Sequence, residues 1–146
     1  MINGKSVLAL IPARGGSKGI KNKNIKKFNG LPLIAHTVNQ ALDVEYIDQL
    51  IVSTDDDDIK KIALHYGAKV PFKRPKKLAN DIATNLEVAL HAIDKIKCDI
   101  LIILQPTSPL RNSDDINKSL NFLFEKDVKA VVGACKVKNY TYSFKM

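Results

Sequence analysis

The sequence predicts an α/β fold with a mostly parallel sheet covered by helices. Apolar runs of strand length alternate with segments whose apolar residues recur at helical spacing, which is typical of β–α–β units. Residues that favour helix ends stand between these segments. A glycine-rich basic loop follows the first apolar run directly, at the end of a strand, where open α/β sheets bind their ligands.

Five apolar runs are expected to form strands. The first, SVLALI, has an uninterrupted apolar interior and is expected to be buried on both faces. In chain order the runs are 6–11, 50–54, a short piece near 68–72, 99–104 and 129–135.

Four segments between these runs have the spacing of amphipathic helices, and one face of each is expected to pack on the core. The expected core-facing residues are Leu31, Ile34, Val38 and Leu42, then Ile59, Ile62, Ala63 and Tyr66, then Leu86, Ala89, Leu90 and Ile93, and finally Ile116, Leu120, Leu123 and Phe124.

Residues at the boundaries of these segments fit helix ends. Pro32 suits a first helical turn, and Asp55 or Asp56 can cap the second helix. Gly67 is expected just after that helix ends, and residues 112–113 are expected to open the fourth helix.

Length and composition predict one compact domain spanning residues 1–146, with 45% apolar and 6% aromatic residues. No apolar run approaches the roughly 20 residues of a membrane helix, and the N-terminus is a poor signal peptide, so a cytoplasmic protein without a membrane partner is expected. Cys98 and Cys135 lack metal-ligand or disulfide spacing and are expected to be buried free thiols.

The net charge of +8 is concentrated in one place. Residues 14–27 hold six cations and no acid, whereas the rest of the chain has 17 cations and 15 acids. A nucleic-acid-binding surface would spread its cations along a face with interleaved aromatic residues, so no nucleic-acid partner is expected. A focused anion pocket explains the pattern better.

The loop IPARGGSKGIKNKN (11–24) has the composition of a triphosphate site. Glycines let backbone N–H groups turn inward, arginine grips phosphate oxygens in pairs, and lysine adds a point charge. Its spacing fits neither the Rossmann fingerprint nor the Walker motif. The alternative is a solvated lysine-rich turn.

Four motifs in order, IPARGGSKGIKNKNI, LIVSTDD, RPKKLANDIATN and LQPTSPLR, resemble the CMP-sialic acid synthetases, or acylneuraminate cytidylyltransferases, from the first strand to about Ala134. The resemblance implies a Rossmann-like three-layer sandwich of the nucleotidyltransferase (GT-A-like) type. Residues 1–146 would be its N-terminal nucleotide-binding portion, without the dimerisation segment and C-terminal strands. It further implies a homodimer that joins CTP to a nine-carbon sugar acid, releases pyrophosphate and uses Mg²⁺.

The resemblance also assigns residues. Arg14, Lys18 and Lys23 would offset charge on the leaving pyrophosphate, and no metal ligand is expected in this chain because the paired aspartates lie on a later strand. The nucleotide-binding set would be Ala13, Arg14, Gly15, Ser17, Lys23, Asn24, Arg74, Ala83 and Asn85. The sugar-binding set would be Gln105, Pro106, Thr107 and Ser108.

Several points stay open. The acid can be N-acetylneuraminic, legionaminic or pseudaminic acid, and the 146 residues can bind CTP without turnover. Asp81 can bind ribose or cap a helix, and Arg111 can pair with a substrate carboxylate or, by preference, a nearby acid. The acids at 55–58 favour helix capping over a metal site. Arg74 can bind the nucleotide or be a surface cation in a basic turn. No residue is an evident general base for the sugar hydroxyl. Lys21 also stands where the family usually has proline, which loosens the loop and adds charge.

Overall fold

The computed structural model describes residues 1–17 and 19–134. Its central sheet has three parallel strands in the order β4 (Gln49–Ser53), β1 (Val7–Pro12) and β5 (Ile100–Ile103). Leu10 of β1 lies opposite Ile51 of β4 and Ile103 of β5. The predicted α/β fold with a parallel sheet is confirmed.

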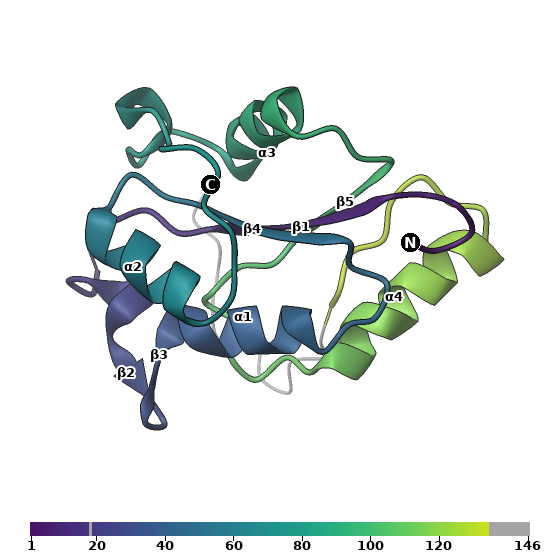
Figure 1. Ribbon diagram of the computed structural model, residues 1–146, viewed down its shortest axis with the longest axis horizontal. Helices are drawn as coiled ribbons and strands as arrows, with labels where there is room; N and C mark the ends of the chain where they lie inside the picture. Colours follow the sequence, from purple (N-terminus) through teal and green to yellow (C-terminus); the bar gives the residue numbers. More distant parts are fainter. Residues whose placement is uncertain (18, 135–146) are drawn as a thin grey trace, which may run out of the picture.

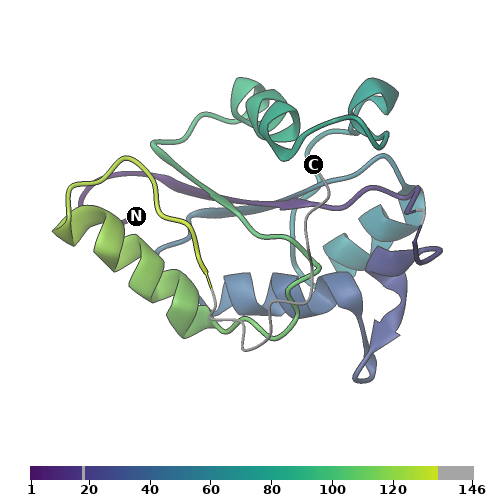
Figure 2. The same cartoon turned by 180° about the vertical axis from the view of Figure 1, so that it is seen from behind.

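Helices cover both faces of this sheet and give three layers (Figures 1 and 2). One face carries α1 (Leu33–Leu42), α2 (Asp57–His65) and α4 (Ser113–Glu125), and the other carries α3 (Asn85–Lys95). The smaller elements are the 3-10 turns η1 (Lys23–Ile25) and η2 (Lys76–Leu78) and an antiparallel hairpin of β2 (Lys27–Phe28) and β3 (Leu31–Pro32). No helix of the described residues is long and apolar enough to cross a bilayer.

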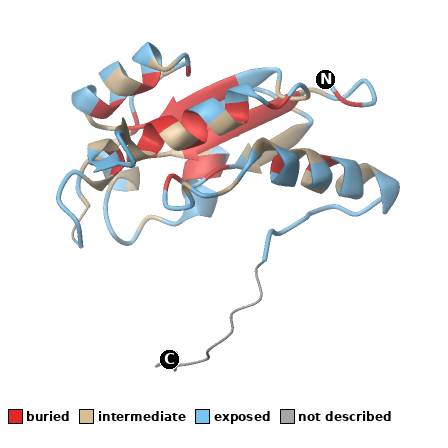
Figure 3. Cartoon of the chain, turned by 90° about the horizontal axis from the view of Figure 1, so that it is seen from below, coloured by how far each residue is buried: buried red, intermediate tan, exposed pale blue. Residues whose placement is uncertain are grey.

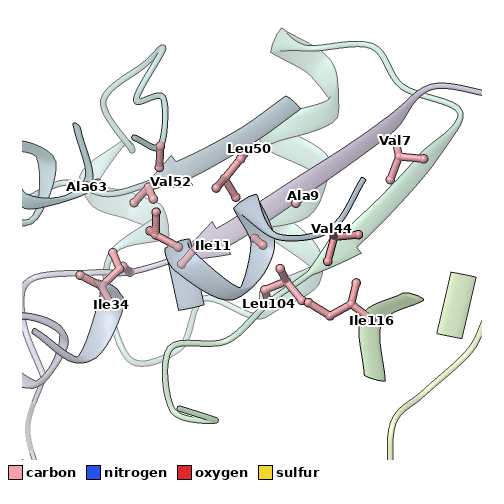
Figure 4. Packing of buried hydrophobic residues seen from close by; sticks show 14 of the residues in the cluster. Val7, Ala9, Ile11, Ile34, Val44, Leu50, Val52, Ala63, Leu104 and Ile116 are labelled. Carbon is pink, nitrogen blue, oxygen red and sulfur yellow. The ribbon is translucent and has the colours of Figure 1, made fainter. Parts of the chain in front are cut away.

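Strand β1 is the centre of the core because successive side chains point to opposite faces of the sheet. Ala9 and Ile11 pack in the cluster beneath α1, α2 and α4 (Figure 4), whereas Leu8 and Leu10 pack in the cluster that includes α3. Strands β1 and β4 form the buried centre of the molecule (Figure 3), whereas β5 is only partly buried. The expectation that β1 is buried on both faces is confirmed.

The predicted helix ends are mostly confirmed. The Asp56 carboxylate accepts two N–H bonds in the first turn of α2, and Gly67, with φ +97°, follows the end of that helix. Asn112 caps α4 and Asp115 bonds back to it. Pro32 differs by one residue, because it closes β3 and the helix begins at Leu33.

Two predicted strands do not form as such. The expected strand at 68–72 runs beside β4 but makes one isolated parallel bridge, at Lys69, and the next bridge follows just beyond it at Lys73. Pro71 between them has no N–H to continue the ladder. Residues 129–134 have no strand structure and are exposed, since none of the described strands pairs with them; Cys135 lies outside the described residues.

Three leucines predicted to face the core are exposed instead. Leu42, Leu86 and Leu90 are 51%, 66% and 52% exposed. Helix α3 turns a neighbouring face to the sheet, with Val88 and Ala92 buried. The predicted buried thiol Cys98 is only half-buried, and burial raises its pKa.

Candidate functional site

A cavity of ≈ 170 Å³ opens where β1 and β5 end and α3 begins. The loop after β1 lines it with Pro12, Arg14, Ser17, Lys23 and Asn24. The segment leading into α3 lines it with Arg74, Leu78, Asn80, Asp81, Ala83, Asn85 and Val88. The loop after β5 adds Gln105, Pro106 and Thr107. Three segments far apart in sequence therefore meet at the carboxyl edge of the sheet, where ligands were expected.

Most residues singled out from the sequence line this cavity, but three of the described ones do not. Ala13 is fully buried and continues the ladder beside β4 through its N–H bond to the Ser53 carbonyl. Gly15 and Ser108 lie outside the described lining, and Lys18 lies outside the described residues.

Arg14 reaches across the cavity to Asp81. Its Nη2 atom is 2.5 Å from Asp81 Oδ1, and the two side chains are 29% and 38% exposed. Asp81 does not cap α3, because Thr84 forms the capping box with Glu87 there. The capping interpretation of Asp81 is therefore wrong, and an ion pair joins the first loop to the segment before α3.

The first loop is anchored to the start of α2. The Gly15 N–H donates to Asp55 Oδ1 at 3.0 Å, and a Cβ atom on Gly15 would lie 2.6 Å from Asp56 Oδ2. Glycine is thus required here for close approach, and its N–H binds a carboxylate. Added Cβ atoms on Gly16 and Gly19 would meet nothing within 4 Å, so close packing does not require glycine at these two positions.

Buried Asn24 fixes the same loop from inside. It is 5% exposed, and its Nδ2 donates to the Arg14 carbonyl at 2.9 Å. The backbone that carries Arg14 is therefore held both at the α2 side and by Asn24. An anchored backbone reduces the conformational entropy that Arg14 loses when it binds an anion.

The four acids at 55–58 are engaged in structural contacts. Asp55 binds Gly15 and Asp56 caps α2, while Asp57 lies 3.2 Å from Lys73 and Asp58 lies 3.6 Å from Lys61. Within residues 1–17 and 19–134, no three acids, histidines or cysteines cluster as metal ligands would.

Asp81 is the one carboxylate in the described cavity lining, and Arg14 pairs with it. Mg²⁺ in proteins is held by oxygen ligands, usually carboxylates, in near-octahedral geometry. These residues therefore do not fit a magnesium site by themselves.

Arg74 is a buried cation in the cavity wall. It is 5% exposed, its Nε donates to Ser53 Oγ at 3.0 Å, and its Nη2 donates to the Ser53 carbonyl. Burial lowers its pKa to about 10, with a nearby Asp55 opposing this and Arg14 adding to it. The interpretation as a surface cation is wrong, and Arg74 stays charged at neutral pH.

The loop after β5 is a tight turn. The Ser108 N–H donates to the Gln105 carbonyl at 3.3 Å, and Arg111 Nη2 donates to the same carbonyl at 2.9 Å. Arg111 was expected to pair with an acid, but in the structure it binds this carbonyl. Burial lowers the pKa of Arg111, while the charge of Asp115 opposes that shift.

Asn80 is a cavity residue that the sequence analysis did not select. Its Oδ1 accepts from the N–H groups of Ile82 and Ala83 at 2.9 and 2.8 Å, and its Nδ2 donates to the Lys77 carbonyl. Asparagine side chains in turns often accept a hydrogen bond from the backbone N–H two residues further on. Asn80 in the stretch LANDIAT is in such a position, so the sequence contains this signal.

The chain is similar in sequence to known proteins. A cytidylyltransferase family model matches residues 8–145. The chain is 38% identical over 132 residues to pseudaminic acid cytidylyltransferase of Campylobacter jejuni, covering 87% of this chain and 57% of that protein. It is 41% identical over 111 residues to N-acylneuraminate cytidylyltransferase of Escherichia coli, covering 75% of this chain and 26% of that protein.

A solved structure shares the fold. CMP:2-keto-3-deoxy-manno-octonic acid synthetase, complexed with CTP, superposes with a TM-score of 0.73 at 26% identity, over 84% of this chain and 48% of that one. The chain thus spans less than two thirds of the length of these relatives. The order of the motifs, the parallel sheet and the match over nearly all its residues show that the chain belongs to the cytidylyltransferase family.

Proposed function

We propose that this chain forms the nucleotide-binding part of an enzyme that transfers CMP from CTP to a nine-carbon sugar acid. The observation that carries the proposal is the cavity in which Arg14, Lys23 and Arg74 converge at the carboxyl edge of a parallel sheet. Three cations in one concave site match the charge of a triphosphate. The related synthetase complexed with CTP supports the choice of nucleotide.

In the proposed reaction, the anomeric hydroxyl oxygen of the acid attacks the α-phosphorus in line. A new P–O bond forms as the bond to pyrophosphate breaks, and the hydroxyl proton leaves to a base that the described residues do not identify. Such a step needs mainly positioning and charge neutralisation. Arg14 and Lys23 line the cavity on the side proposed for the phosphates, and Lys18 is proposed to join them.

Two groups of cavity residues divide the proposed roles. Ser17, Asn24, Ala83 and Asn85 are proposed to contact the nucleotide with Arg14 and Arg74. Gln105, Pro106 and Thr107, from the loop after β5, also line the cavity and are proposed to face the sugar acid. The prolines keep that loop stiff. Ala13, Gly15 and Ser108 are proposed to support the site from behind its described lining.

The identity of the acid is the finer part of the proposal. An N-acylneuraminate is the first candidate, and pseudaminic and legionaminic acids are the alternatives; relatives named for the first two match at 41% and 38% identity. We also propose Mg²⁺ as cofactor, a cytoplasmic location and a homodimer for the complete enzyme, on the family resemblance. The described residues do not by themselves form a site for this metal.

Binding of CTP without turnover is the second candidate function for these 146 residues. The ion pair between Asp81 and Arg14 favours this function. Asp81 is the carboxylate in the described cavity lining, and the pairing engages it in place of a catalytic role as base or metal ligand. Pyrophosphate release with CTP, Mg²⁺ and each acid distinguishes the two candidates. Release at the rate of a full-length relative would exclude the binding-only function.

Calorimetric titration with CTP, UTP, ATP and GTP tests the nucleotide assignment. CTP is expected to bind most tightly, and Arg14→Ala is expected to cost about 2 kcal/mol of affinity through the lost guanidinium–phosphate bonds. Lys26→Ala is the matched control, because Lys26 is exposed on the same loop and outside the described lining. Equal losses in both variants, or no preference for CTP, would contradict the proposal.

A further inference from the structure

The loop between β5 and α4 is held in place by two side chains from outside the cavity. Gln105 lines the cavity and Pro109 follows in the same loop. Prolines at 106 and 109 have no N–H to donate, so this loop makes fewer backbone bonds of its own. Its position therefore depends on donors supplied by other side chains.

The first donor is Arg111, at the end of the loop. Its Nη2 donates to the Gln105 carbonyl at 2.9 Å, and its backbone N–H donates to the Ser108 carbonyl at 3.3 Å. A cation donating to a carbonyl forms a stronger bond than a neutral donor does. Arg111 thus binds the backbone of Gln105 while remaining outside the described cavity lining.

The second donor is Gln40 of α1, which lies on the sheet face opposite α3 (Figure 1). Its Nε2 donates to the Pro109 carbonyl at 2.8 Å, across 69 residues of sequence. The two bonds hold carbonyls near the start and near the end of one loop. The direction of Gln105 is therefore coupled to the packing of α1 as well as to Arg111.

Each of these side chains also has an unsatisfied polar atom. Gln40 Oε1 and Arg111 Nη1 are buried without a hydrogen-bond partner among the described residues. A buried unpaired polar atom is destabilising, and an apolar side chain of similar length would avoid that cost. The presence of polar side chains at these two buried positions is therefore explained by the loop carbonyls that they bind, and not by a gain in folding stability.

We propose that Gln40 and Arg111 are positioning residues that fix the 105–111 loop so that Gln105 faces the sugar-acid side of the cavity. They act through Gln105 and touch neither substrate. The inference rests on the proposed function and adds two residues that determine affinity for the acid. It predicts that acid binding and CTP binding respond differently to their replacement.

The test measures two affinities on the whole chain by calorimetry. The first is for CTP alone, and the second is for N-acetylneuraminic, pseudaminic or legionaminic acid with CTP in excess. Gln40→Met and Arg111→Met are expected to weaken acid binding about tenfold, as expected for loss of one positioning bond of about 1.4 kcal/mol. CTP affinity is expected to stay within about twofold, because the residues proposed to hold CTP lie on other segments. Arg111→Lys keeps a charged donor and is expected to restore part of the acid affinity.

Matched controls and a stability measurement separate positioning from support of the fold. Gln49→Met and Lys118→Met change exposed side chains outside this loop and are expected to alter neither affinity. The melting temperature of Gln40→Met is expected to stay close to that of the parent chain, because removal of the unpaired Oε1 offsets loss of the Nε2 bond to the Pro109 carbonyl.

Three results would decide against the inference. Equal losses of CTP and acid affinity together with a lower melting temperature would show that Gln40 and Arg111 stabilise the fold as a whole and do not specifically position Gln105. Unchanged acid affinity in both methionine variants would overturn the inference directly, as would a chain that binds CTP but none of the three acids. A chain that binds no CTP would instead refute the proposed function itself.

Discussion

Replacement of Asp81 by asparagine is expected to tighten triphosphate binding, although Asp81 lines the cavity. The Arg14 guanidinium is held by Asp81 at 2.5 Å, so a triphosphate has to take Arg14 over from this carboxylate. With side chains 29% and 38% exposed, the ion pair is worth about 0.2 to 1 kcal/mol. A guanidinium–phosphate bond is worth roughly 1.5 to 3 kcal/mol, so the triphosphate wins the exchange.

The expected gain follows from these two magnitudes. Asparagine keeps the shape of Asp81 but removes the charge that competes for Arg14 and repels phosphate. Recovering most of the ion-pair energy corresponds to about two- to fivefold tighter CTP binding, since 1.4 kcal/mol is a factor of ten. Asp81→Glu retains the charge and is expected to resemble the parent chain.

Calorimetric titration with CTP and CMP checks this reasoning. CMP lacks the β- and γ-phosphates, so its affinity is expected to change less than that of CTP. In an Arg14→Ala background the gain from Asp81→Asn is expected to shrink, because the competition is already removed. Weaker binding of CTP and CMP alike in Asp81→Asn would refute the argument and indicate that the carboxylate contacts the ribose.

Two further predictions concern the framework of the site. Gly15→Ala is expected to destabilise the chain by about 1 to 3 kcal/mol in thermal unfolding, because its Cβ would collide with Asp56, whereas Gly16→Ala, with open space around it, is expected to be nearly neutral; equal effects would contradict this. Bonds from Ser6 lower the pKa of Asp99 from its ordinary 3.8, so its contribution is complete above that value and is lost as pH falls through the folded-state pKa. Asp99→Asn is therefore expected to flatten the fall in melting temperature below about pH 4, and an unchanged slope would disprove it.

Much of the fold is predictable from local pattern. The strand at 7–12 and its neighbours are short apolar runs with helical spacing between them, and their parallel order places the following loops at one edge. Sequence spacing does not predict the buried face of a helix when two adjacent faces could both pack against the sheet. The period of α3 is compatible with two adjacent faces, and only contact with the sheet selects Val88 over Leu86.

The sequence predicts which residues belong to the site but not the contacts that they make with one another. Arg14, Lys23 and Gln105 stand in loops that follow strands, and the cavity brings them together. The ion pair between Arg14 and Asp81 spans 67 residues, and no local motif contains it. The burial of Arg74 depends in the same way on the end of β4, because Ser53 supplies its acceptors.

The burial of Arg74 affects how the cavity responds to ionic strength. Mobile ions screen exposed charges over about 8 Å at physiological concentration, so the attraction from the lysine-rich first loop weakens as electrolyte is added. Arg74 as a residue is only 5% exposed, so counterions cannot approach its guanidinium nearly as closely. Part of the pull on a polyanion therefore persists in concentrated electrolyte, and it comes from the wall of the cavity rather than from its rim.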